Sequence, residues 1–279
     1  MSRSVLITGG GSGIGAAAAV RLAQEGWEVC VLGRRTERVA AVAEAVGGFG
    51  VTADVRRPGD VQDAVTACVE RFGRLDALVI CAGAGASGAV LDQTLERFNT
   101  VLGTNLTGAF LTARAALPHL MESAGAIVTV ASLAGLRADP QSAAYCASKA
   151  GLIMLTQCLA LDYGPAGVRA NCVCPGWIKT EMADAAMDEL AATRGTDRRG
   201  AYTLAVAEVP AGRAGRPEEA AAAIAWLASA DASYVNGAVL TVDGGAAVVD
   251  AGTLAFAPQA RPAPATPPVP VTGRPGEVT

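Results

Sequence analysis

Short apolar runs alternate with longer amphipathic segments along most of the chain. Short runs of aliphatic residues are typical of strands buried in a sheet, and longer amphipathic segments are typical of helices packed on it. The pattern predicts strands at Ser4–Thr8, Glu28–Leu32, Phe49–Ala53, Ala77–Cys81, Ala126–Ala131, Arg169–Cys174 and Ala238–Val242. It predicts helices at Gly13–Glu25, Thr36–Val46, Pro58–Phe72, Leu95–Met121, Ala143–Tyr163 and Pro217–Ala228.

This alternation of strand and helix predicts a single α/β domain over residues 1–250. Right-handed helical crossovers between strands form a parallel sheet with helices on both faces. We therefore expect a doubly wound, Rossmann-type fold with a seven-stranded parallel sheet. Ligands of such sheets bind beyond the carboxyl ends of the strands, and the motifs described below fall mainly there.

Two stretches depart from the alternation. Ala183–Val209 is polar, and we expect an irregular insertion there that forms a lid over the substrate. From Ala257 to Thr279 the composition shifts to proline, alanine, threonine and glycine, which predicts a disordered tail.

Composition narrows the classes of function. The chain has 279 residues, 51% of them hydrophobic, and a net charge of −4 without a basic block, so we expect no nucleic-acid partner. The first apolar run is too short for a signal peptide or a membrane span, and we expect no membrane partner. The seven cysteines include Cys172-Val173-Cys174 but no second cluster, which predicts reduced thiols, a cytoplasmic location and no metal site.

A glycine-rich segment, Thr8-Gly9-Gly10-Gly11-Ser12-Gly13-Ile14-Gly15, follows the first predicted strand and opens the first predicted helix. Glycines allow a tight turn and a close approach of the backbone to a diphosphate, and the helix N-terminus offers free N–H groups to the anion. We therefore predict a dinucleotide site with contacts from Gly9, Gly11, Ser12, Gly13 and Ile14.

The residues after the second and third strands bear on which dinucleotide binds. An NAD site usually places a carboxylate after the second strand, whereas this chain has Arg34 and Arg35, and an arginine accommodates a 2′-phosphate. NADP(H) is therefore favoured, and NAD(H) is the alternative if both arginines are simply solvated. Asp54, followed by Val55, can accept a hydrogen bond from the adenine amino group.

Tyr145 and Lys149 stand four residues apart within a predicted helix, so the phenol and the ammonium share one face. A free tyrosine is a poor proton donor or acceptor near neutral pH, and a nearby cation stabilises its phenolate form. The pair is a candidate acid/base device, although a packed ring beside a solvated lysine has the same spacing.

These segments together resemble the short-chain dehydrogenase/reductase superfamily, from about Arg3 to Gly245. The motifs occur in the family's order: Thr8-Gly9…Gly13-Ile14-Gly15, Asp54-Val55, Asn105 in Thr104-Asn105-Leu106-Thr107-Gly108, Ser132, Tyr145 with Lys149, Pro175-Gly176 with Ile178 and Thr180, Gly212-Arg213…Pro217-Glu218-Glu219, and Val235-Asn236-Gly237…Val242-Asp243-Gly244-Gly245.

One motif departs from the family. After the fourth strand the family usually has Asn-Asn-Ala-Gly, and here the stretch is Ile80-Cys81-Ala82-Gly83. The second asparagine commonly helps to fix the central strand near the cofactor, and Cys81 cannot make the same amide bonds. Contacts to the adenosine ribose are still expected from the backbone of Cys81, Ala82 and Gly83.

The resemblance implies hydride transfer between C4 of a nicotinamide and a carbonyl or carbinol carbon. It implies that Tyr145 is the general acid in reduction and the general base in oxidation, that Lys149 supports it and holds the nicotinamide ribose, and that Ser132 bonds the substrate oxygen. Asn105 would hold a water that connects Lys149 to solvent. Singly, Asn105 is also compatible with a helix kink and Ser132 with a strand-end cap.

The segment beside the nicotinamide is implied by the same resemblance. It comprises Pro175, Gly176, Ile178 and Thr180, of which the Ile178 backbone and Thr180 would hold the carboxamide. Taken singly, Thr180 is equally compatible with the N-cap of a following helix.

The segments expected around the substrate are largely apolar, which predicts a medium-sized, apolar ketone or secondary alcohol. They are Leu133, Leu136, Gln141, the Gly83–Gly88 loop, Trp177 and the lid. The predicted function is an NADP(H)-dependent ketoreductase. The alternatives are an NAD-dependent secondary-alcohol dehydrogenase of the same fold and a non-catalytic nucleotide-binding scaffold. The resemblance also implies a homo-oligomer, commonly a tetramer, built through the fourth and fifth helices and the last strand.

Overall fold

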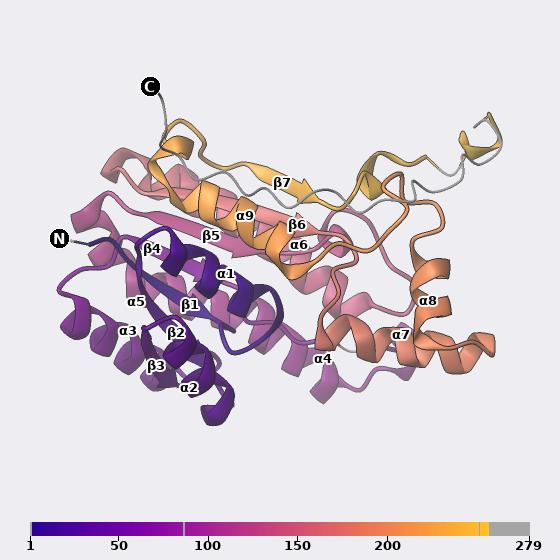
Figure 1. Ribbon diagram of the computed structural model, residues 1–279, viewed down its shortest axis with the longest axis horizontal. Helices are drawn as coiled ribbons and strands as arrows, with labels where there is room; N and C mark the ends of the chain where they lie inside the picture. The colour runs from indigo at the N-terminus through magenta and orange to yellow at the C-terminus, as the bar shows by residue number, and fades with distance from the viewer. Residues whose placement is uncertain (1, 86, 251, 257–279) are drawn as a thin grey trace, which may run out of the picture.

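The computed structural model describes residues 2–85, 87–250 and 252–256, and the predicted tail lies outside them. Its centre is one parallel sheet in the order β3-β2-β1-β4-β5-β6-β7 (Figure 1). The strands are β1 (Ser4–Thr8), β2 (Glu28–Gly33), β3 (Phe49–Thr52), β4 (Ala77–Ile80), β5 (Ala126–Val130), β6 (Arg169–Pro175) and β7 (Val239–Val242). The predicted seven-stranded parallel sheet is confirmed. Its order reverses between β1 and β4, the kind of position at which doubly wound sheets bind ligands.

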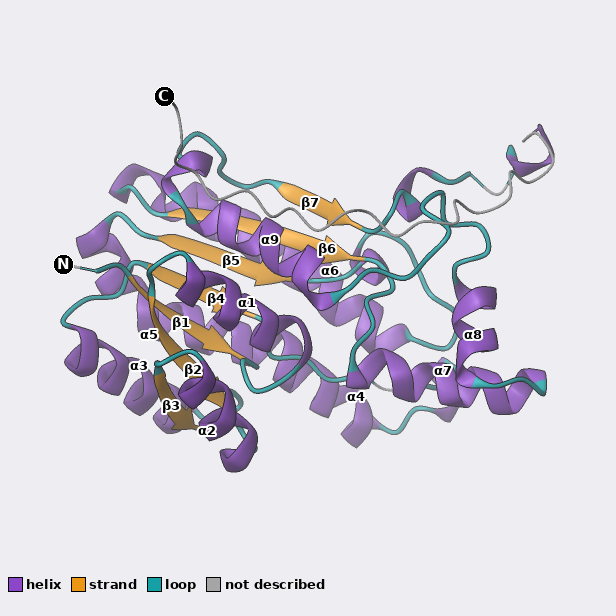
Figure 2. Ribbon diagram, viewed as in Figure 1, coloured by secondary structure: helices purple, strands orange, loops and turns teal. Residues whose placement is uncertain are grey.

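Helices cover both faces of the sheet (Figure 2). One face carries α1 (Gly13–Gln24), α2 (Thr36–Ala45) and α9 (Pro217–Ala228), and the other carries α3 (Pro58–Phe72), α5 (Gly108–Ser123) and α6 (Ala143–Tyr163). Alternate strand residues feed the two cores. Leu6 packs with the buried side chains of α3 and α5, whereas Val5 and Ile7 pack with those of α1 and α9.

The helix ends follow from local sequence. In α3, Pro58 occupies the first turn, where a missing N–H costs no helical hydrogen bond, and Asp60 complements the positive end of the helix dipole. The helix stops at Gly73, which takes the left-handed conformation with φ of 77°. Such signals explain why most predicted helix boundaries lie close to those observed.

The single helix predicted over Leu95–Met121 is wrong. The segment forms α4 (Leu95–Leu102), a π-helical turn η2 (Gly103–Thr107) and α5. A Cβ at Gly108 would lie 2.7 Å from Val55 Cγ2, so the chain passes very close to the β3–α3 connection here. The π turn places Asn105 inside, fully buried, and such turns frequently occur at functional sites.

The irregular insertion predicted over residues 183–209 is also wrong. It contains most of α7 (Glu181–Arg194) and all of α8 (Arg198–Ala205), which lie beyond the carboxyl ends of the strands (Figure 1). A narrow apolar stripe of Ala183, Met187 and Ala191 recurs every fourth residue and is buried, partly against Ala201 of α8. Most other residues of both helices are polar, so this stripe was not recognised in the sequence.

One described helix, α6 with the short turn after it (Ala143–Ala166), is long and apolar enough to cross a membrane by composition alone. In this fold it packs against β6 and buries Leu152, Ile153 and Leu159 in the core. The buried part of its apolar composition is therefore accounted for by its place beside the sheet.

Candidate active site

Tyr145 and Lys149 lie on one face of α6, with Lys149 Nζ 5.7 Å from the centroid of the Tyr145 ring. Lys149 is only 4% exposed, and its ammonium donates to the Val130 carbonyl at the end of β5 at 2.8 Å. A buried ammonium has three protons to place, and no second hydrogen-bond partner for it lies in residues 2–85, 87–250 or 252–256. Two donors are thus left for groups from outside the chain.

Asn105 ties the loop after β4 to α6. Its side-chain oxygen accepts from the Ala84 N–H at 2.7 Å, and its amide nitrogen donates to the Ala84 carbonyl and to Ser148 Oγ, both at 2.9 Å. Ser148 Oγ in turn donates to the Tyr145 carbonyl at 2.7 Å. Ser148, fully buried, was missed by sequence reasoning, although it directly precedes Lys149.

Both amide protons of Asn105 are used in these bonds. A water between Asn105 and Lys149 could therefore not accept from the side-chain amide, but it could donate to the second lone pair of Asn105 Oδ1 or to a backbone carbonyl of the π turn. Gly83 borders both residues, since a Cβ there would lie 3.7 Å from Lys149 Nζ and 3.8 Å from Asn105 Oδ1. The missing side chain leaves room beside them.

Ser132 follows β5, whose last carbonyl accepts the hydrogen bond from Lys149. Its hydroxyl oxygen accepts from the Ala134 N–H at 3.2 Å and so caps the short turn η3 (Leu133–Gly135). That turn lies directly on α6, because a Cβ at Gly135 would come within 2.8 Å of the Lys149 backbone. The cap uses the oxygen and leaves the hydroxyl proton to donate elsewhere, so capping and a bond to a substrate oxygen are compatible.

The glycine-rich loop fits a diphosphate. Gly9 has φ of 67°, and a Cβ there would lie 2.8 Å from Ala82; a Cβ at Gly15 would lie 2.4 Å from the Gly9 carbonyl oxygen. Ser12 is the N-cap residue of α1, yet neither it nor any other described side chain caps the first turn at Gly13 and Ile14. Backbone N–H groups at a helix N-terminus of this kind suit an anion.

The unusual Cys81 segment is held by Thr8, which was predicted only as part of the loop motif. Thr8 Oγ1 accepts from the N–H groups of Cys81 at 3.1 Å and Ala82 at 3.2 Å, which joins β1 to the end of β4. Burial raises the pKa of the Cys81 thiol to about 11, against an opposing effect of Lys149. The thiol is therefore neutral near pH 7.

At the adenosine end, Arg34 is exposed after β2, and Arg35 donates to Ser12 Oγ at 2.8 Å. Asp54 after β3 pairs with Arg56, whose Nη2 lies 2.6 Å from Asp54 Oδ2. The hydrogen bonds from Arg56 hold the pKa of Asp54 at about 2. Both carboxylate oxygens are engaged by Arg56, so a bond from the adenine amino group would use a remaining lone pair and stays a prediction. Val55 is buried beside it.

The segment after β6 is held by the chain that precedes α9. A Cβ at Gly176, next to Pro175, would lie 3.0 Å from Asp243, and Ile178 is buried. The Gly215 N–H donates to the Trp177 carbonyl at 2.8 Å, and the Lys179 N–H donates to the Gly215 carbonyl at 2.9 Å. This pairing places two of the C-terminal motifs against the segment after β6.

Thr180 joins this segment to the glycine-rich loop. Its hydroxyl caps α7 by accepting from the Ala183 N–H at 3.2 Å. A Cβ at Gly13 would lie 3.2 Å from Thr180 Cγ2, so the loop and the start of α7 are in contact range. The N-cap interpretation of Thr180 is confirmed, and a hydrogen bond to a carboxamide stays a prediction.

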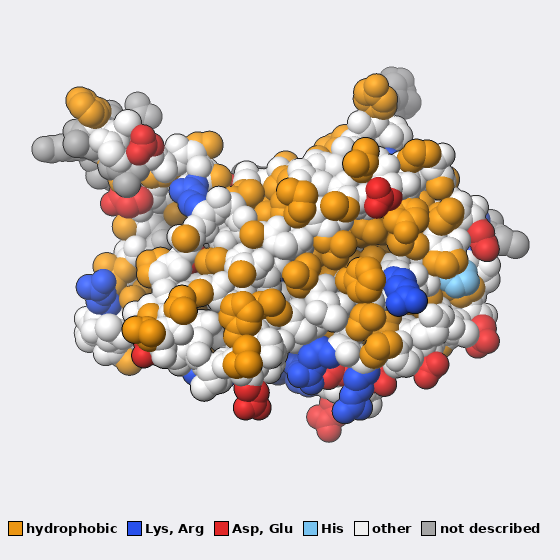
Figure 3. Space-filling model, turned by 180° about the vertical axis from the view of Figure 1, so that it is seen from behind, with side chains coloured by type: hydrophobic (Ala, Val, Ile, Leu, Met, Phe, Trp, Pro, Cys, Tyr) orange, Lys and Arg blue, Asp and Glu red, His pale blue; other side chains and the backbone are white. Residues whose placement is uncertain are grey.

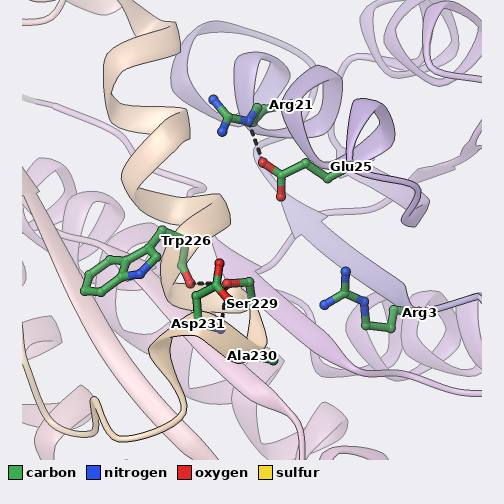
Figure 4. A pocket seen from close by; sticks show the side chains of 7 residues that line it. All are labelled: Arg3, Arg21, Glu25, Trp226, Ser229, Ala230 and Asp231. Atoms are coloured by element: carbon green, nitrogen blue, oxygen red, sulfur yellow. Dashed lines mark hydrogen bonds and ion pairs between the residues drawn. The ribbon is translucent and has the colours of Figure 1, made fainter. Parts of the chain in front are cut away.

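The described residues offer no metal site, and a polar hollow on the surface lies away from the candidate active site. Within the part of the chain that the structure describes, no group of three His, Cys, Asp or Glu side chains is arranged to hold a metal, and the seven cysteines are free thiols. A polar surface hollow of about 460 Å³ lies near Arg3, Arg21, Glu25, Trp226 and Asp231 (Figure 4). Because Arg3 immediately precedes β1, this hollow lies at the amino end of the sheet, opposite the candidate site.

Comparisons with known proteins agree with this geometry. A family model described as enoyl-(acyl carrier protein) reductase matches residues 9–247. The protein MoaE of Klebsiella aerogenes is 41% identical over 92% of this chain and its own whole length, and a meso-2,3-butanediol dehydrogenase of Serratia marcescens is 38% identical over 89% of this chain and 96% of its own.

A solved structure extends the comparison. A variant of the actinorhodin polyketide ketoreductase, solved with NADPH, superposes with a TM-score of 0.84 at 34% identity, covering 88% of this chain and 97% of that one. Family match, relatives and fold agree with the motifs at the strand ends. The chain therefore belongs to the short-chain dehydrogenase/reductase superfamily and is an NAD(P)-dependent oxidoreductase.

Proposed function

We propose that the protein is an NADP(H)-dependent ketoreductase acting on a medium-sized, largely apolar ketone, with the corresponding secondary alcohol as product. The observation that carries the coenzyme preference is the pair Arg34 and Arg35 directly after β2, where an NAD site would place a carboxylate. The similar polyketide ketoreductase was solved with NADPH, which supports the same preference.

The coenzyme would lie across the carboxyl ends of β1 and β4. The helix N-terminus at Gly13 and Ile14 would hold the diphosphate, Arg34 and Arg35 the 2′-phosphate, and Asp54 and Val55 the adenine. The backbone of Cys81, Ala82 and Gly83 would contact the adenosine ribose, and Pro175, Gly176, Ile178 and Thr180 would flank the nicotinamide. When bound, the nicotinamide supplies or accepts the hydride.

The chain's own residues would handle the proton. Tyr145 would protonate the carbonyl oxygen during reduction, and Ser132 would donate a hydrogen bond to that oxygen and stabilise its developing charge. The two free donors of Lys149 would bond the nicotinamide ribose and a water. Asn105 would hold this water, through its side-chain oxygen or through the backbone of the π turn.

Apolar side chains near the site support an apolar substrate. Leu136 after η3, Trp177 after β6 and Met182 in α7 are each between 42% and 48% exposed. With α7 and α8 acting as the lid, these side chains would close over the substrate. The printed names of the relatives, a butanediol dehydrogenase and a polyketide ketoreductase, are consistent with an alcohol or ketone substrate.

We further propose a homotetramer in the cytoplasm. Phe110 on α5 and Met154 and Leu161 on α6 are 47%, 59% and 78% exposed. Figure 3 shows hydrophobic side chains gathered on the side of the molecule that is turned away in Figure 1. A patch of this kind marks a protein interface. The free cysteines agree with a reducing compartment.

The test is a panel of ketones and secondary alcohols assayed with NADPH, NADH and their oxidised forms. We expect turnover of apolar ketones with kcat/KM at least about tenfold higher for NADPH than for NADH, the size of one charge-assisted contact. Equal or better turnover with NADH would refute the coenzyme preference. Binding of NADPH without turnover of any compound would favour the scaffold alternative.

A further inference from the structure

An ion-pair cluster bridges the two sides of the coenzyme site. Glu181, the first residue of α7, accepts hydrogen bonds from Arg38 Nη1 at 2.5 Å and from Arg35 Nη1 at 3.2 Å. Arg38 lies in the first turn of α2, 143 residues before Glu181 in the chain. The two guanidinium groups hold the pKa of Glu181 below its ordinary value, so it is a carboxylate at neutral pH.

This cluster lies over the glycine-rich loop. The other terminal nitrogen of Arg35, Nη2, donates to Ser12 Oγ at 2.8 Å. A Cβ at Gly11 would lie 3.3 Å from Arg38 Cβ, and Gly13 borders Thr180, the neighbour of Glu181. Arg35 and Arg38 therefore face the stretch of loop along which the adenosine diphosphate of a coenzyme runs.

The pairs are open to exchange. The side chains of Arg35, Arg38 and Glu181 are 56%, 52% and 53% exposed, and ion pairs that exposed contribute little to stability. A 2′-phosphate carries a larger charge and more acceptor oxygens than a carboxylate, and it binds arginine in the same bidentate manner. A carboxylate and a 2′-phosphate at this place would compete for the same guanidinium groups and repel each other.

We propose that Glu181 is a specificity-determining residue that weakens the preference for 2′-phosphorylated coenzymes by competing for Arg35 and Arg38. This inference rests on the proposed use of the arginine side of the site for the 2′-phosphate. Arg34 is then the arginine left to the phosphate, since no ion pair or side-chain hydrogen bond to it occurs in the described chain. Glu181 reduces the difference in affinity between NADP(H) and NAD(H) that the arginines alone would create.

The experiment compares Glu181→Gln with the wild type by titrating NADPH, NADH and 2′,5′-ADP at one fixed salt concentration, with thermal unfolding to verify the fold. We expect the dissociation constants of NADPH and 2′,5′-ADP to fall roughly threefold to tenfold, and that of NADH to stay within about twofold. A matched control is Glu37→Gln, which removes the same charge in the first turn of α2 without removing an observed ion pair. It should change the ratio of the two dissociation constants by less than about twofold.

Weaker NADPH binding by Glu181→Gln, or an equal change for NADPH and NADH, would overturn the proposal. So would an equal gain from Glu37→Gln, because that would reduce the effect to overall charge. The double variant Arg38→Ala/Glu181→Gln is a second test. It should lose part of the increase in NADPH affinity that Glu181→Gln alone produces. If the wild type prefers NADH but Glu181→Gln lowers the dissociation constant of NADPH relative to that of NADH, the proposed coenzyme preference fails while the role of Glu181 stands.

Discussion

The proposed catalytic centre is built in the opposite way to the rim of the proposed coenzyme site, which consists of Arg34, Arg35, Arg38 and Glu181. In the centre, Asn105, Ser148 and Lys149 are at most 4% exposed, each donates to a backbone carbonyl, and Asn105 also donates to Ser148. On the rim, Arg35 and Glu181 are more than half exposed and meet only through side chains. The centre is fixed by the folding of the sheet, whereas the rim can rearrange around a ligand.

This difference follows from the cost of leaving a polar group unpaired. A buried amide or ammonium that loses its partner has no water to replace it, so the buried network holds one geometry. An exposed guanidinium exchanges a carboxylate for water or phosphate at little cost. We therefore expect substitutions to leave the kind of reaction unchanged. We expect the coenzyme preference to change when a single charge on the rim is changed.

The largest effect is expected at the centre from Tyr145→Phe. Removing the phenol hydroxyl removes the proton donor, so kcat should fall by roughly 10²–10⁴-fold while the dissociation constant of NADPH changes by less than about twofold. Stopped-flow assays and coenzyme titration measure the two quantities. Tyr163→Phe, at the other end of α6, is the matched control and should leave kcat unchanged. An unchanged kcat in Tyr145→Phe would show that Tyr145 is not the proton donor.

Arg34→Asp should have the next largest effect. It should change the coenzyme preference, which depends on the rim, and leave the catalytic centre unaffected. Losing a charge-assisted bond and placing a carboxylate near the 2′-phosphate should shift the kcat/KM ratio toward NADH by roughly 10–100-fold. Thermal unfolding should change little, because Arg34 is exposed. Arg71→Asp makes the same charge change near the end of α3 and should leave the ratio unaltered. A comparable shift in both variants would mean that overall charge, not a contact, sets the preference.

Ser148→Ala tests whether the centre is as rigid as its burial indicates. The change leaves one Asn105 amide proton without its partner, which should lower the free energy of unfolding by about 1–3 kcal/mol and reduce kcat. Urea unfolding and steady-state assays measure both. Ser142→Ala, which removes a 3.2 Å bond to the Pro140 carbonyl outside the helix, should have a much smaller effect on stability. Similar losses in both variants would count against a special role for the buried network.

The smallest effect is expected from Glu219→Gln. This change removes an ion pair that supports the segment after β6. Arg213 donates to Glu219 at 2.7 and 2.8 Å, the Arg216 N–H donates at 2.7 Å, and the pKa of Glu219 is lowered from 4.5 to about 2. The stabilisation is therefore fully present above pH 4.5 and is lost as the pH falls toward 2. We expect a loss of about 1 kcal/mol at pH 7, since the pair is partly exposed.

The check is urea unfolding of the wild type and Glu219→Gln at pH 7 and near pH 3. The difference in unfolding free energy should shrink at the lower pH. Glu218→Gln, in the same first turn of α9, is the control and should show a weaker pH dependence. A difference between Glu219→Gln and the wild type that does not vary with pH would locate the effect in the amide rather than in the charge.

Much of the fold and of the candidate site could be predicted because the signals are local. A run such as Ser4–Thr8 followed by glycines and an amphipathic segment predicts strand, turn and helix without knowledge of the rest of the chain. Parallel strands place their carboxyl ends at one edge, so residues following different strands were expected together. Tyr145 and Lys149 needed only the helical repeat.

Other features left weak signals or none. The stripe of Ala183, Met187 and Ala191 could have predicted α7, but polar residues dominate the segment. The π turn at Gly103–Thr107 changes the hydrogen-bond register of the backbone, which hydrophobic periodicity does not record.

The sequence by itself determined the family and the seven-stranded sheet, and it supplied the candidate active-site side chains, because each depends on short-range patterns. Tertiary structure decided which of those side chains are satisfied by partners far along the chain. Thr8 holds the Cys81 segment from 73 residues away, and Ser148 meets Asn105 across 43 residues. Glu181 likewise meets Arg38 only because α7 returns to the start of α2. Such contacts are set by the packing of whole elements, and no local pattern specifies the distance between two side chains on different elements.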